Sequence, residues 1–108
     1  CEVIGRMDYA YELQDEAYFL GSYEPMLIAH APSHYLKKMY LDCVCYHPPA
    51  ARCGIETIGA DRILFGTDAP PLAPLKDRGL RVIRKLDLDP ADEEKIFSGN
   101  ARKLLKLH

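Results

Sequence analysis

The residues best placed to do chemistry follow an apolar run, "ILF", at positions 63–65. A run without polar alternation is typical of a strand that is covered on both faces. Pro70 and Pro71 cannot donate hydrogen bonds to a neighbouring strand, so pairing must end before them. In α/β folds, ligands and catalytic groups collect at the carboxyl ends of parallel strands. Asp68 is therefore predicted to present a carboxylate at that edge, although aspartate also commonly caps a turn.

A second group of possible ligands follows the pattern C-x-C-x-H-x5-C, formed by Cys43, Cys45, His47 and Cys53. Thiolates and imidazoles together hold structural zinc ions. The spacing departs from the C-x2-C pair of such sites, and cysteine is commonly a small buried apolar residue. A small structural-zinc domain is the alternative interpretation of these residues.

His30 and His34 are four residues apart, the spacing that places two imidazoles on one helical face. Pro32 lies between them and argues against one continuous helix. We therefore predict that both are surface or turn residues rather than a metal-binding pair.

The composition is that of an ordinary globular protein. The chain has 108 residues, of which 48% are hydrophobic, and a formal net charge of −2. These values argue against disorder and against nucleic-acid binding through bulk charge. No apolar stretch approaches the roughly 20 residues that span a bilayer. The four cysteines do not resemble a disulfide framework, so reduced thiols and a cytoplasmic location are expected. A chain that opens on Cys1 is also expected to have a longer natural start.

The periodicity of apolar residues, together with the positions of glycine and proline, then predicts an order of helices and strands. Helices are expected at residues 6–20, 33–39, 48–58 and 80–86, with a further helix capped by Asp89 and a last one restarting at Asn100 after Gly99. Strands are expected at residues 40–46 and 63–66. A helix between two strands is a βαβ unit, which implies a parallel sheet. Two strands alone would leave exposed edges, so the sequence indicates part of a larger domain.

The stretches "ILFGTDAP" and "GNARKLL", with "YLDCVCYHPP" before them, resemble the C-terminal third of the amidohydrolase-related family, which includes aminocarboxymuconate-semialdehyde decarboxylase and aromatic-acid decarboxylases. The similarity extends over about residues 5–107. It implies a distorted (β/α)8 barrel, of which residues 1–108 would be the C-terminal segment. Residues 40–46 and 63–66 would then be the seventh and eighth strands.

The resemblance also implies roles for three residues. Asp68 matches the aspartate that ends the last strand, which in relatives binds the catalytic divalent metal, zinc or manganese, and handles a proton. His47 follows the seventh strand and would contact the substrate. Arg6, in "IGRMD", resembles an arginine that binds a substrate carboxylate in some decarboxylases, a task for which guanidinium is well shaped.

The family's His-x-His pair has no counterpart in this sequence. A catalytic zinc needs about three protein ligands, so Asp68 alone cannot hold one. The chain by itself is expected to be inactive, and the missing ligands are expected in an N-terminal part of the barrel. The complete protein is predicted to be a metal-dependent decarboxylase or hydrolase of a small carboxylated or aromatic substrate, forming a homo-oligomer, with no nucleic-acid or membrane partner. The alternative is a non-catalytic barrel remnant or oligomerisation module.

Overall fold

The computed structural model describes residues 3–16, 27–71, 74 and 76–107. The chain divides into two compact units, Cys1–Met39 and Tyr40–His108, which are described in turn. None of the helices in the described residues has both the length and the apolar character needed to cross a membrane.

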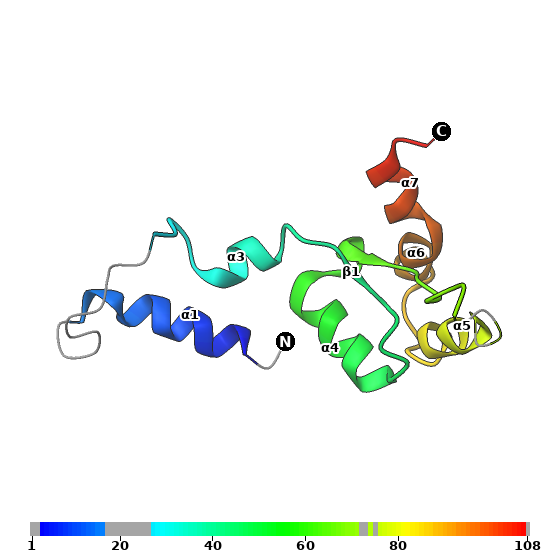
Figure 1. Ribbon diagram of the computed structural model, residues 1–108, viewed down its shortest axis with the longest axis horizontal. Coiled ribbons are helices and arrows are strands. Elements are labelled where there is room, and N and C mark those ends of the chain that lie inside the picture. The colour runs from blue at the N-terminus through cyan, green and yellow to red at the C-terminus, as the bar shows by residue number, and fades with distance from the viewer. Residues whose placement is uncertain (1–2, 17–26, 72–73, 75, 108) are drawn as a thin grey trace. The chain divides into compact units, whose positions relative to one another are not determined.

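The first unit is a pair of helices. Helix α1 (Ile4–Glu12) runs into a single 3₁₀ turn, η1 (Leu13–Asp15), and the short helix α3 (Pro32–Leu36) lies beside α1 (Figure 1). The backbone amide of Ser33 donates to the Asp8 carboxylate at 2.8 Å, which joins the start of α3 to α1. The predicted helix at residues 6–20 is confirmed as far as Asp15, whereas positions 17–26 lie outside the described residues.

The second unit contains the βαβ arrangement that the sequence predicts. Strands β1 (Leu41–Asp42) and β2 (Ile63–Leu64) pair in parallel, with Leu41 opposite Ile63. Helix α4 (Pro48–Ile58) connects them and is followed by a 3₁₀ turn, η2 (Ala60–Arg62). Prolines occupy the first turn of α4, where their missing amide hydrogens cost nothing. Gly59 ends the helix with φ at 94°, as the sequence predicts.

The first strand covers only residues 41 and 42 of the predicted span 40–46, so that prediction is wrong for residues 40 and 43–46. The second strand likewise covers residues 63 and 64 of the predicted 63–66. The Asp42 carboxylate accepts a hydrogen bond from the Val44 backbone amide at 2.9 Å, which holds the chain in a local turn. Beyond Cys43, side chains therefore no longer alternate between the two faces of a strand. Strand alternation over residues 40–46 would place Cys43 and Cys45 on the same face, but Cys43 is buried and Cys45 is exposed.

The rest of the second unit is helical. Helix α5 (Lys76–Arg84) precedes α6 (Pro90–Glu94), which continues through a π-helical segment, η4 (Lys95–Gly99), into α7 (Asn100–Leu105) (Figure 1). The predicted cap is confirmed, because the Asp89 carboxylate accepts from the Ala91 amide at 2.9 Å. The last helix, α7, begins at Asn100 as predicted, but no break precedes it, because η4 carries the helical chain through Gly99. Ile83, Leu86 and Ile96 form the centre of the core.

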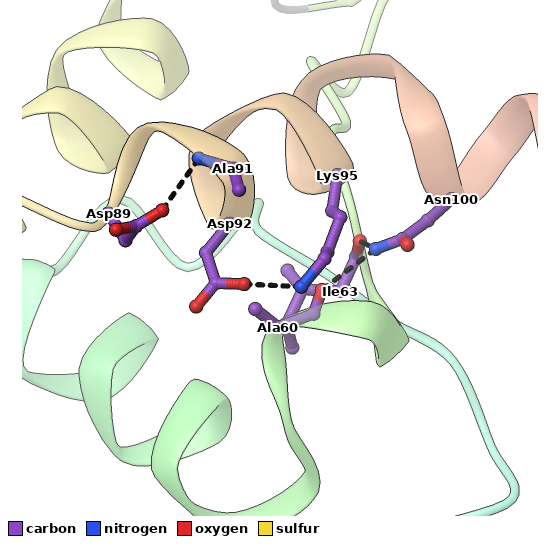
Figure 2. A network of polar contacts seen from close by, with 7 residues as sticks. All are labelled: Ala60, Ile63, Asp89, Ala91, Asp92, Lys95 and Asn100. Atoms are coloured by element: carbon purple, nitrogen blue, oxygen red, sulfur yellow. Dashed lines mark hydrogen bonds and ion pairs between the residues drawn. The ribbon is translucent and has the colours of Figure 1, made fainter.

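A buried side chain joins this long helix to β2. Asn100 is only 5% exposed, and its amide nitrogen donates to the carbonyls of Ala60 and Ile63, each at 2.8 Å (Figure 2). The Phe65 amide also donates, at 3.0 Å, to the carbonyl of Ile96, which is a residue of η4. The i to i+5 bonding of a π-helix leaves a carbonyl free for such a contact. The end of β2, and so the start of the segment that carries Asp68, is therefore fixed from the helix side.

The close approach of the two strand ends yields a stability prediction for Gly66→Ala. A Cβ atom at this position would lie 2.8 Å from Val44 Cγ2 and 3.5 Å from Asp42 Cβ. Valine is stiff about χ1 and cannot easily move away. We expect a loss of about 1–3 kcal/mol in the free energy of unfolding, as for other overpacked sites, measured by chemical denaturation.

Gly54→Ala provides the matched control for Gly66→Ala. Gly54 lies in helix α4, and a Cβ there would have only an ordinary contact of 4.0 Å with Ile63. Alanine is the better helix former, so this variant is expected to be neutral or stabilising by up to about 1 kcal/mol. Equal stabilities of the two variants would contradict the crowding between the strand ends.

Candidate active site

The candidate site is the edge of the sheet where both strands finish. Because β1 and β2 are parallel, their carboxyl ends lie at the same edge. The Cys43 amide extends the ladder by one bond, donating to the Leu64 carbonyl at 3.1 Å. The loops that leave this edge, residues 43–47 and 65–71, carry two of the three predicted site residues.

Asp68 lies four residues beyond the end of β2 and is exposed. Its φ of 54° places it in the left-handed region, which aspartate tolerates better than most residues. Within the described part of the chain, six carboxylates accept a hydrogen bond from a backbone amide or a side chain, or form an ion pair. They are those of Asp8, Asp42, Asp61, Asp89, Asp92 and Glu94. Among the described residues, no hydrogen bond or ion pair to the Asp68 carboxylate is found.

Tyr46 ties the two loops together, a role that the sequence analysis missed. Its hydroxyl donates to the carbonyl of Thr67, the residue before Asp68, at 3.1 Å. The Arg78 guanidinium lies over the Tyr46 ring, 5.5 Å from its centroid. The sequence placed Tyr46 inside a strand, and nothing there distinguished its hydroxyl from that of Tyr40 at the other end of the same segment. A single bond thus couples the loop after β1 to the backbone beside Asp68.

His47 lies in the loop after β1, as expected, and is exposed. It is the residue that precedes helix α4, and its carbonyl accepts from the Ala51 amide at 3.1 Å while its imidazole makes no capping bond. Arg6 is exposed on α1, in the first unit. The structure thus brings Asp68 and His47 to one edge of the sheet in the second unit, and their roles stay predictions.

The cysteine and histidine pattern does not form one cluster. The buried thiol of Cys43 meets the backbone of Gly66, and Cys45 Sγ lies 3.7 Å from the His47 carbonyl oxygen. Cys53 lies on α4, where its thiol contacts the Thr57 hydroxyl. Among the residues that the structure describes, no three His, Cys, Asp or Glu side chains gather so as to hold a metal ion. The structure therefore offers no support for the structural-zinc interpretation.

The contrast between two neighbouring thiols gives a chemical prediction. Cys43 is 2% exposed, and burial raises the pKa of its thiol, whereas Cys45 is exposed. Alkylation requires an accessible thiolate. Iodoacetamide at neutral pH is therefore expected to modify Cys45 well before Cys43, as fragmentation of the tryptic peptide 39–52 would show. Faster modification of Cys43 would contradict its burial against Gly66.

His30 and His34 are both exposed, as predicted, and their ring centroids are 4.3 Å apart. Desolvation, followed by the charges of Lys38 and His30, lowers the pKa of the His34 imidazole. The lowered pKa means that acid protonates His34 less readily than a free histidine, because desolvation and then the neighbouring charge of Lys38 disfavour the imidazolium form. The contact is an aromatic pair at the start of α3.

The described residues fit only part of a catalytic metal site. Asp68 has the hard oxygen donor and the exposure that a divalent cation requires. A catalytic zinc takes about three protein ligands, and within the described ranges no second and third ligand join Asp68. Any metal in the complete protein would need further ligands besides this carboxylate.

Comparison with known proteins gives a consistent result. A family model described as amidohydrolase matches residues 23–107. Similar solved structures include 2,6-dihydroxybenzoate decarboxylase from Rhizobium, with 25% identity and a TM-score of 0.73 over 98% of this chain. Another is 5-carboxyvanillate decarboxylase from Sphingomonas paucimobilis, with 19% identity and a TM-score of 0.75 over 99% of this chain. The match covers 31% of the first of those chains and 30% of the second.

These proteins have the TIM-barrel fold of the amidohydrolases, and this chain corresponds to less than a third of the length of such a barrel. The resemblance that rested on "ILFGTDAP" and "GNARKLL" is thereby confirmed. Because the family model covers most of its residues, the protein belongs to the amidohydrolase family.

Proposed function

We propose that the complete protein is a divalent-metal-dependent decarboxylase of a small aromatic carboxylate. The observation that carries the proposal is the position of Asp68. This carboxylate follows a strand of a parallel pair, at the edge where α/β enzymes place their chemistry, and has no internal partner within the described residues. The aromatic-acid decarboxylases among the similar structures favour this reaction over hydrolysis.

In the proposed enzyme, β1 and β2 would be the seventh and eighth strands of the barrel. A two-stranded parallel sheet is unusual alone, because such sheets are normally covered on both faces. Several apolar side chains in the described residues are also largely exposed, among them Val3 at 64% and Leu105 at 64%. Further polypeptide packed on these surfaces would account for both features.

In the proposed reaction, Asp68, His47 and Arg6 have different tasks. Decarboxylation breaks the bond between the ring and the carboxylate, CO₂ leaves, and the ring carbon takes up a proton. A bound metal would supply Lewis acidity. Asp68 would contribute one ligand oxygen and hold or pass a proton, His47 would contact the substrate, and Arg6 would bind its carboxylate. Zinc and manganese both accept a carboxylate ligand.

The test uses the complete protein and follows CO₂ release from 2,6-dihydroxybenzoate and 5-carboxyvanillate. We expect decarboxylation of at least one aromatic carboxylate, its loss on treatment with a chelator, and its recovery with zinc or manganese. Aryl esters and anilides serve as the comparison substrates. Hydrolysis of these without CO₂ release would replace the proposal with a hydrolase, and turnover that survives complete metal removal would refute the metal requirement.

A further inference from the structure

A pocket of about 400 Å³ lies in the second unit, outside the residues assigned to the reaction. Its walls come from helix α5 and from the residues that follow β1. Tyr46, Pro48, Arg78, Arg81, Val82 and Lys85 line it. This volume falls within the range of small-molecule sites, which runs from about 300 to 1,000 Å³.

Three cationic side chains from α5 and from the turn directly after it line this pocket. Arg78 and Arg81 lie on α5, and Lys85 is the first residue beyond its end. The Lys85 amide donates to the Arg81 carbonyl at 3.1 Å, so the spacing of three and four residues places the three side chains on one side of this segment. All three are exposed, and the ion pairs found between described residues involve other side chains. Like charges at this spacing repel one another, and an anion between them would relieve that repulsion.

The aromatic wall of the pocket orients one of these cations. The Arg78 guanidinium lies over the Tyr46 ring at 5.5 Å, and the Tyr46 hydroxyl is held by the Thr67 carbonyl at 3.1 Å. A guanidinium stacked on a ring keeps its N–H groups free at the edge, where they can meet a second acceptor. Tyr46 therefore restricts Arg78 before any ligand arrives, which lowers the entropy cost of binding.

We propose that this pocket binds a phosphate group carried by a small molecule. Two arginines and a lysine supply three positive charges and several donors, which suit a phosphate dianion better than a single carboxylate. The apolar surfaces of Val82 and Pro48 would contact the organic part of a phosphate ester. The site is separate from Asp68, but Tyr46 joins it to the backbone of Thr67, next to Asp68.

The test measures binding to the complete protein by titration calorimetry at constant ionic strength. The probes are inorganic phosphate, phenyl phosphate and acetate. Both phosphates are expected to bind more tightly than acetate. Added salt should weaken the binding of both phosphates, because the cationic side chains of the pocket are exposed. Tighter binding of phenyl phosphate would identify an organic ester as the ligand, and equal binding would identify free phosphate.

A double variant and a control variant test whether phosphate binds in this pocket. Arg81→Gln combined with Lys85→Gln should weaken phosphate binding at least tenfold, and both positions are exposed, so the melting temperature should change little. The control is Arg84→Gln, which removes another exposed cation of α5 that does not line the pocket. An equal loss in the control, acetate binding as tight as phosphate binding, or no binding of either phosphate at millimolar concentration would overturn the proposal. None of these outcomes depends on turnover, so the result is independent of the proposed reaction.

Discussion

Asp68→Asn in the complete protein is expected to lower the rate of decarboxylation by on the order of 10²–10⁴-fold, the usual contribution of a group that transfers a proton. The substitution replaces a charged oxygen by an amide that neither accepts a proton near neutral pH nor neutralises a cation. The content of bound zinc or manganese is expected to fall as well, because a ligand charge is lost. Steady-state kinetics and metal analysis of the purified variant give both values.

The same substitution should leave the fold intact, and the geometry explains why asparagine is the right replacement. Asp68 has a φ of 54°, and asparagine tolerates this left-handed conformation as well as aspartate does. The side chain is also exposed and makes no ion pair within the described residues, so no internal contact is broken. A loss of activity with an unchanged unfolding curve would therefore report on chemistry.

Asp61→Asn is the matched control for that experiment. Asp61 is also an exposed aspartate close to β2, in the 3₁₀ turn before the strand, and its contact with Arg62 is long, at 3.7 Å. Surface pairs of this kind contribute about 1 kcal/mol or less. Wild-type activity in Asp68→Asn, or an equal loss in Asp61→Asn, would remove Asp68 from the proposed catalytic group.

Local sequence signals predict two helix boundaries, the start of α6 and the end of α4, because the atoms that fix them are close in the chain. The helix expected at residues 80–86 instead covers Lys76–Arg84, and the one expected at 33–39 covers Pro32–Leu36. Asp89 caps α6 through an amide two residues away, and Gly59 ends α4 with a backbone angle that other residues rarely adopt. The parallel pairing of the strands follows from the helix between them. Asp68 could be located beyond β2 because the apolar run ends before it and Pro70 and Pro71 cannot pair, although the strand itself already ends at Leu64.

The failed predictions depend on interactions that compete with the local pattern. Alternation over residues 40–46 favours a strand, but the Asp42 side chain holds the Val44 amide and turns the chain. Gly99 favours a break, yet η4 continues the helix through it, and the carbonyl of Ile96 in this segment accepts a hydrogen bond from the Phe65 amide. The link from Tyr46 to Thr67 joins residues 21 positions apart, and no spacing rule anticipates it.

Asn100 is a case in which the sequence shows that a residue matters and only the structure shows why. The motif "GNARKLL" contributes to the family resemblance, but the partners of Asn100 are 37 and 40 residues away. Its amide satisfies two carbonyls where η2 passes into β2 (Figure 2). Both acceptors belong to buried residues, Ala60 and Ile63, so water cannot easily replace the bonds.

Asn100→Ala is accordingly expected to destabilise the complete protein by about 2–5 kcal/mol, since each buried polar group left unpaired costs about 1–3 kcal/mol. Asn100→Asp should be at least as damaging. An ionised carboxylate has nearly the same shape but offers no donor, so it would face two carbonyl oxygens in a buried position. Chemical denaturation monitored by circular dichroism measures both changes.

Lys95→Gln separates this effect from a general weakening of the long helix. Lys95 lies one turn before Asn100, where its ammonium group binds Asp92 at 2.6 Å on the surface, which raises the pKa of Lys95 through that hydrogen bond (Figure 2). An exposed pair of this kind is worth about 1 kcal/mol or less, so the variant should unfold almost like the wild type. If Asn100→Ala cost no more than Lys95→Gln, the two carbonyl bonds would not be what holds β2 to the helix. The segment that carries Asp68 would then need another support, because its start is fixed by that same strand end.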